Sequence, residues 1–421
     1  MHLIIFSDLL TPRIKYIFTF IFKEILKAEV EFTGNRQYFL ESSNARISYG
    51  ASPLADEVFF KSTSLLFANK FDKINLKTTT FDDYSVPFPV EESALPFDVF
   101  AASFLILTRY EEYLHQKTSE EDFKPSQSLQ SKWKMLNRPV IDEWALIIKS
   151  IIKKKYATLK FTEKTFSHQP LLNFAVVPEL PDGFVNKAKF VFSTLFKKEN
   201  NFLSAKFDEL TGVGAKAETI IDKVNPTLKG KIKPIYFVEF PSVPINYVRI
   251  NGVSQRLRDK PVGLLRPCAS DKEKLGQILD GLTKLKKILP GQVSLMSLQM
   301  EPLRFPICYL NLHSAGITTD FSMGYPNVPG FRAGTCTPFN WYDLQLEKVT
   351  PLVINSYCLT DLQLQNLPLP EARALISKYL NVVITVSGSF YTCWNLKSLS
   401  PSPKYKKLST LFNEMLAQAG I

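Results

Sequence analysis

The stretch LLNFAVV at residues 171–177 is a nearly continuous apolar run between two prolines, and it indicates how the second half of the chain folds. A continuous apolar run of this length is typical of a strand buried on both faces of a parallel sheet. Similar runs recur as IYFVEF at 235–240, PVGLLRP at 261–267 and SLMSL at 294–298, and an amphipathic helix is expected at 271–289. Strands that alternate with helices in this way favour a barrel or a doubly wound sheet.

The N-terminal part of the chain predicts a smaller α/β unit. Its expected elements are strands at 2–9, 29–34 and 45–50, and helices at 12–27, 54–67, 96–114 and 141–154. Beyond a linker at 157–170, further helices are expected at 184–197, 215–223 and 306–315, and a last strand at 389–394. We therefore predict an N-terminal α/β domain at residues 1–160 and a second domain at 161–421.

The composition is that of a globular protein, and it excludes several classes. The 421 residues are 45% hydrophobic and 22% charged, and the formal net charge is +11. The basic residues form short clusters at expected helix ends, without the interleaved exposed aromatics of a nucleic-acid surface, so no nucleic-acid partner is expected. Five cysteines without a C-x-x-C pair indicate neither a disulfide framework nor a zinc ribbon.

The first residues, MHLIIFSDLLTPRIKYIFTFIFKEILK, give an expectation about localisation. They begin apolar but carry no basic region and no small-residue cleavage site, so no signal peptide is predicted. The apolar run at 14–26 is interrupted by charges and is too short to span a bilayer. We therefore expect a cytoplasmic protein without a membrane span.

The ends of the predicted strands are where chemistry is expected in α/β folds of this kind. Here they present Glu179, Asp182, Arg266 and Asn395, and no histidine. The four histidines, at positions 2, 115, 168 and 313, are scattered and are expected to serve at the surface or as helix caps. The adjacent acidic pairs at 82/83, 91/92 and 111/112 are expected to be solvated, because neighbouring carboxylates on a helix or strand do not converge.

The most distinctive segment is GITTDFSMGYPNVPGFRAGTCTPF at 316–339, which is rich in glycine and proline. It predicts a long ordered loop, and such loops on α/β scaffolds are commonly functional. Its candidate ligand-binding side chains are Asp320, Tyr325, Arg332 and Thr335. A structural plug is the alternative interpretation.

Four motifs carry a resemblance to a known family. They are DVFAASFLILTRYEEYL at 98–114, RPVIDEW at 138–144, GITTDFSMGY at 316–325 and PGFRAGTCTPF at 329–339. In these motifs the chain resembles the bacterial polysaccharide deacetylase (NodB-homology) family, in the branch that carries an α/β domain ahead of the catalytic one. The resemblance implies that residues 161–421 form a distorted (β/α) barrel of the polysaccharide deacetylase type, with a metal-dependent site for acetylated sugars.

The resemblance also implies where the catalytic groups would stand. The family's aspartate pair falls on Val177 and Glu179, and its proton donor falls on Asn395. Its principal histidine ligand falls on Arg266, with Ser270 in the same segment. An arginine keeps its proton and would repel a metal ion. Arg266 and Glu179 are therefore expected to pair where the metal would otherwise lie.

These substitutions predict a catalytically degenerate pseudoenzyme with no metal cofactor, which binds a glycan, an acetylated sugar or a protein partner. The expected ligand-binding residues are Asp320, Tyr325, Arg332, Thr335 and Trp394. One alternative is an active carbohydrate deacetylase or other hydrolase of C–N bonds, with rearranged chemistry that uses Glu179, Asp182 or Asp320. The other is a ligand-free structural or regulatory partner of an active homologue.

Overall fold

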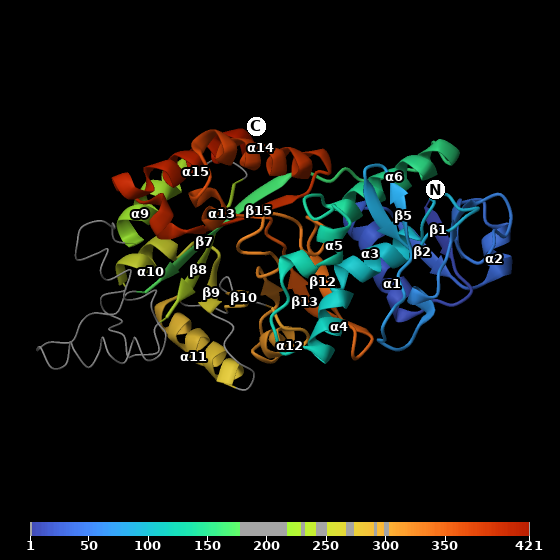
Figure 1. Ribbon diagram of the computed structural model, residues 1–421, viewed down its shortest axis with the longest axis horizontal. Helices are drawn as coiled ribbons and strands as arrows, with labels where there is room; N and C mark the ends of the chain where they lie inside the picture. Colours follow the sequence, from blue (N-terminus) through green and yellow to red (C-terminus); the bar gives the residue numbers. More distant parts are fainter. Residues whose placement is uncertain are drawn as a thin grey trace, which may run out of the picture.

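The computed structural model describes residues 2–176, 217–228, 232–240, 251–266, 273–289, 293–298 and 303–420, apart from the side chains of residues 251, 266, 273 and 274. The fold is mixed α/β, with a four-stranded parallel sheet, a two-stranded hairpin and a curled nine-stranded sheet (Figure 1). Several predictions lie outside the described residues: Val177, Glu179, Asp182, Ser270, the helix at 184–197 and the side chain of Arg266.

The four-stranded sheet comes from the N-terminal part of the chain. Its parallel strands β1 (Leu3–Phe6), β2 (Val30–Thr33), β3 (Ala45–Gly50) and β4 (Val58–Lys61) follow the order β2-β1-β3-β4. Helix α1 (Pro12–Phe18) begins after Thr11, whose hydroxyl accepts a hydrogen bond from the Ile14 amide. It continues as a π-helix over Thr19–Ile25. The predicted helix at 12–27 is confirmed, although its second half is wound more widely than an α-helix.

Of two further helix predictions for this part of the chain, one is wrong and one is confirmed only in part. The segment predicted as a helix at 54–67 contains β4 and a 3-10 turn at Leu65–Phe67. Residues of β4 alternate between buried and half-buried, which is the two-residue period of a strand. The helix predicted at 96–114 is broken at Arg109, whose φ of 55° separates α3 (Val99–Leu107) from α4 (Tyr110–Thr118).

The other elements of this part are short, except for one helix. They are α2 (Arg36–Glu41), β5 (Thr78–Phe81), β6 (Tyr84–Pro87), α5 (Leu129–Lys132) and α6 (Val140–Lys155). Helix α6 confirms the helix predicted at 141–154. Its buried stripe includes Trp144, Ile148 and Ile152, so it packs into the core along one face.

The curled sheet contains the strands predicted from the apolar runs. In sheet order they are β12 (Phe339–Asp343), β13 (Lys348–Ile354), β11 (Thr319–Asp320), β10 (Leu295–Leu298), β9 (Val262–Arg266), β8 (Ile235–Glu239), β7 (Ser167–Ala175), β15 (Ser389–Asn395) and β14 (Leu359–Thr360). All neighbours are parallel except β12 and β13. The sheet curls into a half-barrel, and β7 begins at Ser167, inside the segment predicted as a linker.

Helices follow the strands of the curled sheet. They are α9 (Ala217–Val224), α10 (Asn251–Leu257), α11 (Glu273–Ile288), α12 (Ile307–Ser314), α13 (Asp361–Gln365), α14 (Leu369–Thr385) and α15 (Lys406–Ala419). Helices α14 and α15 pack against each other and lie along one side of the sheet, near β15 (Figure 1). None of the helices in the described part of the chain is both long and apolar enough to cross a bilayer.

The concave face of the curled sheet is filled by a core cluster of its own. The cluster comprises Leu171, Ile235, Phe237, Leu265, Phe321, Tyr357, Tyr391 and Cys393. The Phe321 ring lies between those of Phe237 and Tyr391, with centroids 5.4 and 5.7 Å away. Gly263 is needed beside them, because a Cβ at this position would lie 2.5 Å from the Phe237 ring. The half-barrel therefore encloses a packed core rather than an open channel.

The main core cluster contains side chains from both predicted domains, so the packing continues from one to the other. Phe20 of the π-helix meets Phe339 of β12, with ring centroids 6.0 Å apart. The indole N–H of Trp341 donates to the Tyr113 hydroxyl over 3.0 Å. The hairpin of β12 and β13 thus joins the curled sheet to the N-terminal helices, and the division at residue 160 stays a prediction.

Candidate functional site

The carboxyl ends of β15, β7, β8, β9 and β10 lie side by side, and we call this the carboxyl edge. The register pairs Asn395 with Asn173 and Ala175 with Glu239. Side chains two residues apart on a strand share a face, so Asn173, Glu239 and Asn395 continue the concave face of Leu171, Phe237 and Cys393. On β10, Ser297 follows Leu295 in the same way. Polar groups therefore gather where the apolar interior ends.

Asn173 is the residue of this edge that most clearly indicates a contact with a ligand or water. Its side chain is 4% exposed, and its Nδ2 donates to Cys393 Sγ over 3.1 Å. Its Oδ1 has no hydrogen-bond partner within the part of the chain that the structure describes. Leaving a buried polar atom unpaired costs about 1–3 kcal/mol, so this oxygen is suited to accept a hydrogen bond from a ligand hydroxyl or from water.

Asn395, where the resemblance puts a proton donor, has a local structural role. Its Oδ1 accepts from the Lys397 amide at 3.1 Å and caps the 3-10 helix Leu396–Leu399. Its own amide donates to Asp361 at 2.9 Å, and Ser398 donates to the same carboxylate at 2.6 Å. Burial raises the pKa of Asp361, against the effect of these hydrogen bonds.

Three of the four histidines, His2, His115 and His313, lie away from the carboxyl edge. His2 precedes β1, with Nε2 3.2 Å from the Glu31 carboxylate. His115 is in the last turn of α4, with Nε2 3.0 Å from the Glu121 carbonyl. His313 is exposed in the last turn of α12, which leads into the amino end of β11. The predicted capping or surface role is confirmed for His115 and His313.

The fourth histidine, His168, was predicted at the surface of a linker, and that prediction is wrong. It is 1% exposed near the amino end of β7, and its ring lies 5.0 Å from that of Phe390. Burial lowers the pKa of His168 to about 3, so its imidazole is neutral. A strand rises about 3.3 Å per residue, which puts the His168 backbone about 23 Å from Ala175 at the carboxyl edge.

Metal ligands are also scarce elsewhere. Across the described ranges no three His, Cys, Asp or Glu side chains are grouped closely enough to hold a metal ion. A divalent metal in a hydrolase needs several such ligands and an open position for water. The described residues therefore supply no complete ligand set.

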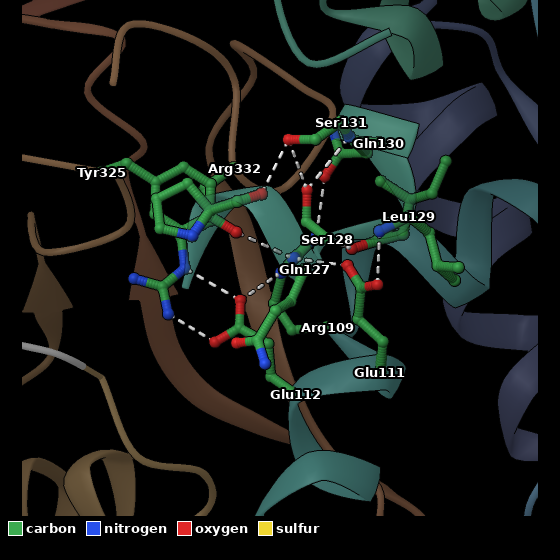
Figure 2. Close-up of polar contacts among 12 residues, drawn as sticks. Arg109, Glu111, Glu112, Gln127, Ser128, Leu129, Gln130, Ser131, Tyr325 and Arg332 are labelled. Atoms are coloured by element: carbon green, nitrogen blue, oxygen red, sulfur yellow. Dashed lines mark hydrogen bonds and ion pairs between the residues drawn. The ribbon is translucent and has the colours of Figure 1, made fainter. Parts of the chain in front are cut away.

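The loop after β11 runs to the N-terminal helices and joins a buried ionic network there. Its members are Arg109, Glu111, Glu112, Gln130, Tyr325 and Arg332 (Figure 2). Arg332 binds Glu112 through two nitrogens, with Nε 2.9 Å from Oε1. Arg109 Nε donates to the same Oε1 at 2.8 Å, and its other nitrogens reach Gln130 at 2.7 Å and the Tyr325 hydroxyl at 3.3 Å. Two motifs far apart in sequence thus meet in one contact.

The prediction that the acidic pair 111/112 is solvated is wrong. Glu112 is fully buried. Burial alone would raise the pKa of Glu112, but the guanidiniums of Arg332 and Arg109 outweigh it and hold that pKa below its usual value. Both carboxylates converge because Arg109 lies in the left-handed break between α3 and α4 and reaches each of them. The pairs at 82/83 and 91/92 are exposed, as predicted.

The other predicted ligand-binding residues also have internal partners. Thr335 donates to Asp142 of α6 at 2.6 Å, and the Cys336 amide donates to the same carboxylate at 3.1 Å. Asp320 accepts from the Tyr309 hydroxyl at 3.1 Å and from the Ser322 amide at 3.0 Å. Burial raises the pKa of Asp320 to about 6.

Trp394 is fully buried and lies on the face of β15 opposite Cys393, where it contacts the C-terminal helix. Its ring centroid is 5.1 Å from that of Phe412 in α15, and its N–H donates to Thr392 at 3.0 Å. The structure does not bring Asp320, Tyr325, Arg332, Thr335 and Trp394 together in one pocket. Their role in ligand binding stays a prediction, and the contacts described here are internal to the chain.

Sequence reasoning missed the polar groups of the concave face, namely Asn173, Glu239 and Ser297. Each follows an apolar concave residue by two positions near the end of a buried strand. That spacing is the signal that could have found them, because it continues the inward face of the strand.

Comparisons with known proteins add little beyond the N-terminal part. A model of a family of unknown function, DUF7033, matches residues 3–157. No curated protein matches the chain. Among solved structures, a protein assigned as a polysaccharide deacetylase from Mycobacterium smegmatis is 13% identical over 61% of this chain and 85% of its own, with a TM-score of 0.38. A 4-alpha-glucanotransferase from Thermococcus litoralis is 12% identical over 61% of this chain and 38% of its own, with a TM-score of 0.34. Similarity at this level carries no conclusion about activity.

Proposed function

We propose that this chain is a polysaccharide deacetylase-like protein without metal-dependent catalysis, and that it binds a glycan at the carboxyl edge of its curled sheet. The observation that supports the proposal most is the position of the histidines. All four lie in described residues and none is at that edge. A deacetylase of the family that the motifs resemble needs imidazoles there, as metal ligands and as the proton donor to the leaving amine.

The groups that remain at the edge suit sugar hydroxyls. Asn173 offers an unpaired carbonyl oxygen, Asn395 an amide NH₂ group and Ser297 a hydroxyl. Amide and hydroxyl side chains both donate hydrogen bonds to hydroxyl groups and accept them, and a few such side chains over an apolar floor are enough to orient a small ligand. Arg266 and Glu179, as a pair in place of a metal, belong to the same proposal.

The test is titration calorimetry of the purified full chain with N-acetylglucosamine oligomers, together with an assay for acetate release. We expect binding, weakened about tenfold by Asn173→Ala. Asn381→Ala, at an exposed position of α14, is the matched control and leaves the affinity unchanged. Acetate release that rises with added zinc, cobalt or nickel would overturn the non-catalytic part of the proposal. The absence of any oligosaccharide binding would overturn the proposal that the chain binds a glycan.

A hydrolase with rearranged chemistry is the second candidate, and one observation favours it. Burial raises the pKa of Asp320 to about 6, within the range in which a carboxyl group can act as a general acid or base. If acetate release is detected without added metal, Asp320→Asn separates the two candidates. Loss of turnover in a folded variant supports the hydrolase, and unchanged turnover removes Asp320 from it.

A further inference from the structure

The strand β2 forms an outer edge of the four-stranded sheet, on the side away from β4. Among the described residues it pairs with β1 alone. Val30 and Phe32 are half-buried, and Glu31 is exposed. Helix α2, which follows β2, lies at the end of the molecule farthest from the curled sheet (Figure 1). This edge is therefore accessible to another chain.

The backbone groups of two residues of β2 point away from the sheet. The Leu3 amide donates to the Glu29 carbonyl at 3.0 Å, and the Ser7 amide donates to the Thr33 carbonyl at 3.2 Å. The hydrogen-bonding groups of successive residues point to opposite sides of a strand, so residues 29, 31 and 33 face β1. Val30 and Phe32, both within β2, therefore present their N–H and C=O groups outward. An outward row of this kind is a template for another strand.

The strand β2 lacks the features that commonly protect an edge. Natural edge strands carry lysine or proline, contain a bulge, or are covered by another segment. The sequence of β2, VEFT at 30–33, contains neither residue, and its register with β1 is uninterrupted. Its one charged side chain, Glu31, has partners within the chain: it accepts from the Tyr38 hydroxyl at 3.1 Å and lies 3.2 Å from His2 Nε2. The edge therefore keeps its capacity to pair.

Charges decide how a second copy of β2 can pair with this edge. In an antiparallel pair around a two-fold axis, outward residues lie opposite outward residues. Val30 opposite Phe32 of the copy puts Glu31 opposite Glu31, and Val30 opposite Val30 puts Glu31 opposite Glu29. Like charges directly opposite each other are destabilising. Phe32 opposite Phe32 is the remaining register, and it puts Glu31 opposite Thr33.

This register also brings opposite charges together. It places Glu29 opposite Asn35 of the copy, whose backbone is extended, and next to Arg36, the first residue of α2. Glu29 and Arg36 are both exposed, and neither takes part in an ion pair among the described residues. The two-fold axis repeats this contact, so the interface carries it twice. Lys23, whose Nζ lies 5.7 Å from the centre of the Phe32 ring, is a like charge brought near its copy, but it is exposed and its repulsion is screened by salt.

We propose that the chain forms a symmetric dimer in which β2 pairs antiparallel with β2 of a second copy, with Phe32 on the two-fold axis. The Phe32 N–H of each copy donates to the Phe32 carbonyl of the other, and the two half-buried rings cover each other. The two four-stranded sheets become one continuous sheet. This inference is independent of the glycan proposal, because it concerns a different sheet.

The first test is sedimentation velocity of the purified full chain from about 1 to 200 µM. We expect a monomer–dimer equilibrium with a Kd of about 10–100 µM, as for a small transient interface. Glu29→Arg and Arg36→Glu each turn both contacts into like-charge pairs, so each should weaken the dimer at least about tenfold. Glu371→Arg, at an exposed position in the first turn of α14, is the matched control and leaves the Kd unchanged.

A mixture of the two variants gives the sharpest result. One Glu29→Arg chain and one Arg36→Glu chain have opposite charges at both contacts, so an equimolar mixture should dimerise as tightly as the unmodified chain. An unmodified chain that stays monomeric at about 200 µM would overturn the proposal. So would a mixture that dimerises no more tightly than either variant alone.

Hydrogen exchange at single-residue resolution separates β2 pairing from any other dimer. The Phe32 amide points outward in the monomer and donates across the axis in the dimer, so its exchange should slow about two- to sevenfold between about 1 and 200 µM. The Thr33 amide faces β1 in both states, so its exchange should not change. A dimer in which the Phe32 amide exchanges as fast as in the monomer would overturn the β2 interface.

Discussion

Replacement of Glu112 by glutamine is the sharpest test of the buried ionic network. Glu112 is fully buried and accepts three hydrogen bonds, two from Arg332 and one from Arg109. Glutamine keeps the shape but removes the negative charge, and it turns an NH₂ group toward a guanidinium nitrogen. Breaking a buried ion pair in this way costs about 3–5 kcal/mol, because an uncompensated charge remains inside. We expect the free energy of unfolding in urea to fall by that amount.

The control for this change is Glu143→Gln. Glu143 pairs with Arg138 at 2.9 Å, but the side chains are 20% and 33% exposed, so the expected loss is about 1 kcal/mol or less. A double variant, Glu112→Met with Arg332→Met, removes both charges of the main pair and leaves Arg109 with Glu111. It should recover part of the stability lost in Glu112→Gln. If Glu112→Gln costs less than about 1 kcal/mol, the network does not hold the loop as described here.

Three further predictions concern stability. Gly334→Ala should lower the free energy of unfolding by about 1–3 kcal/mol, because φ is 67° and a Cβ would lie 2.6 Å from Ile106. Gly316→Ala, with φ 79° but open space around the Cβ, should lower it by about 1 kcal/mol, and urea unfolding of both variants checks this. The pKa of His168 is about 3 in the folded chain, below its unfolded value, so its contribution to the free energy of unfolding is complete above pH 6.5. That contribution falls by about 1.4 kcal/mol for each pH unit below 6.5, and His168→Gln should remove this part of the slope when unfolding is measured from pH 7.5 to 5. The pKa of Asp320 is about 6 in the folded chain, above its unfolded value, so the unmodified chain is most stable relative to Asp320→Asn near pH 4. This difference in the free energy of unfolding should fall by about 3 kcal/mol as pH rises through 6, and a flat difference would contradict the burial of this carboxyl.

The apolar runs predicted the strands of the curled sheet because burial on both faces leaves a direct mark in the sequence. The runs at 171–177 and 235–240 became β7 and β8, shifted by at most a few residues. Patterns of single elements also gave helices α6 and α11. What local patterns could not give is the break at Arg109, since its left-handed backbone is held by contacts with Glu112 and Gln130.

The candidate site was predicted less well, for a related reason. The polar loop residues looked available for a ligand, because sequence alone does not show which polar groups satisfy one another. Arg332 and Thr335 are taken up by Glu112 and Asp142, which are 220 and 193 residues away in the chain. Asn173, in contrast, lies inside an apolar run and was not predicted as a site residue, although its carbonyl oxygen has no partner in the described part of the chain.

The Glu112–Arg332 contact also has a consequence for how relatives of this chain diverge. Two residues 220 positions apart depend on each other's charge, so a change at one is tolerated only with a compensating change at the other. Aligned homologues should therefore show these two columns varying jointly. A hybrid gene that takes its 5′ part from one distant relative and its 3′ part from another should give a poorly expressed product unless both donors share the same pair.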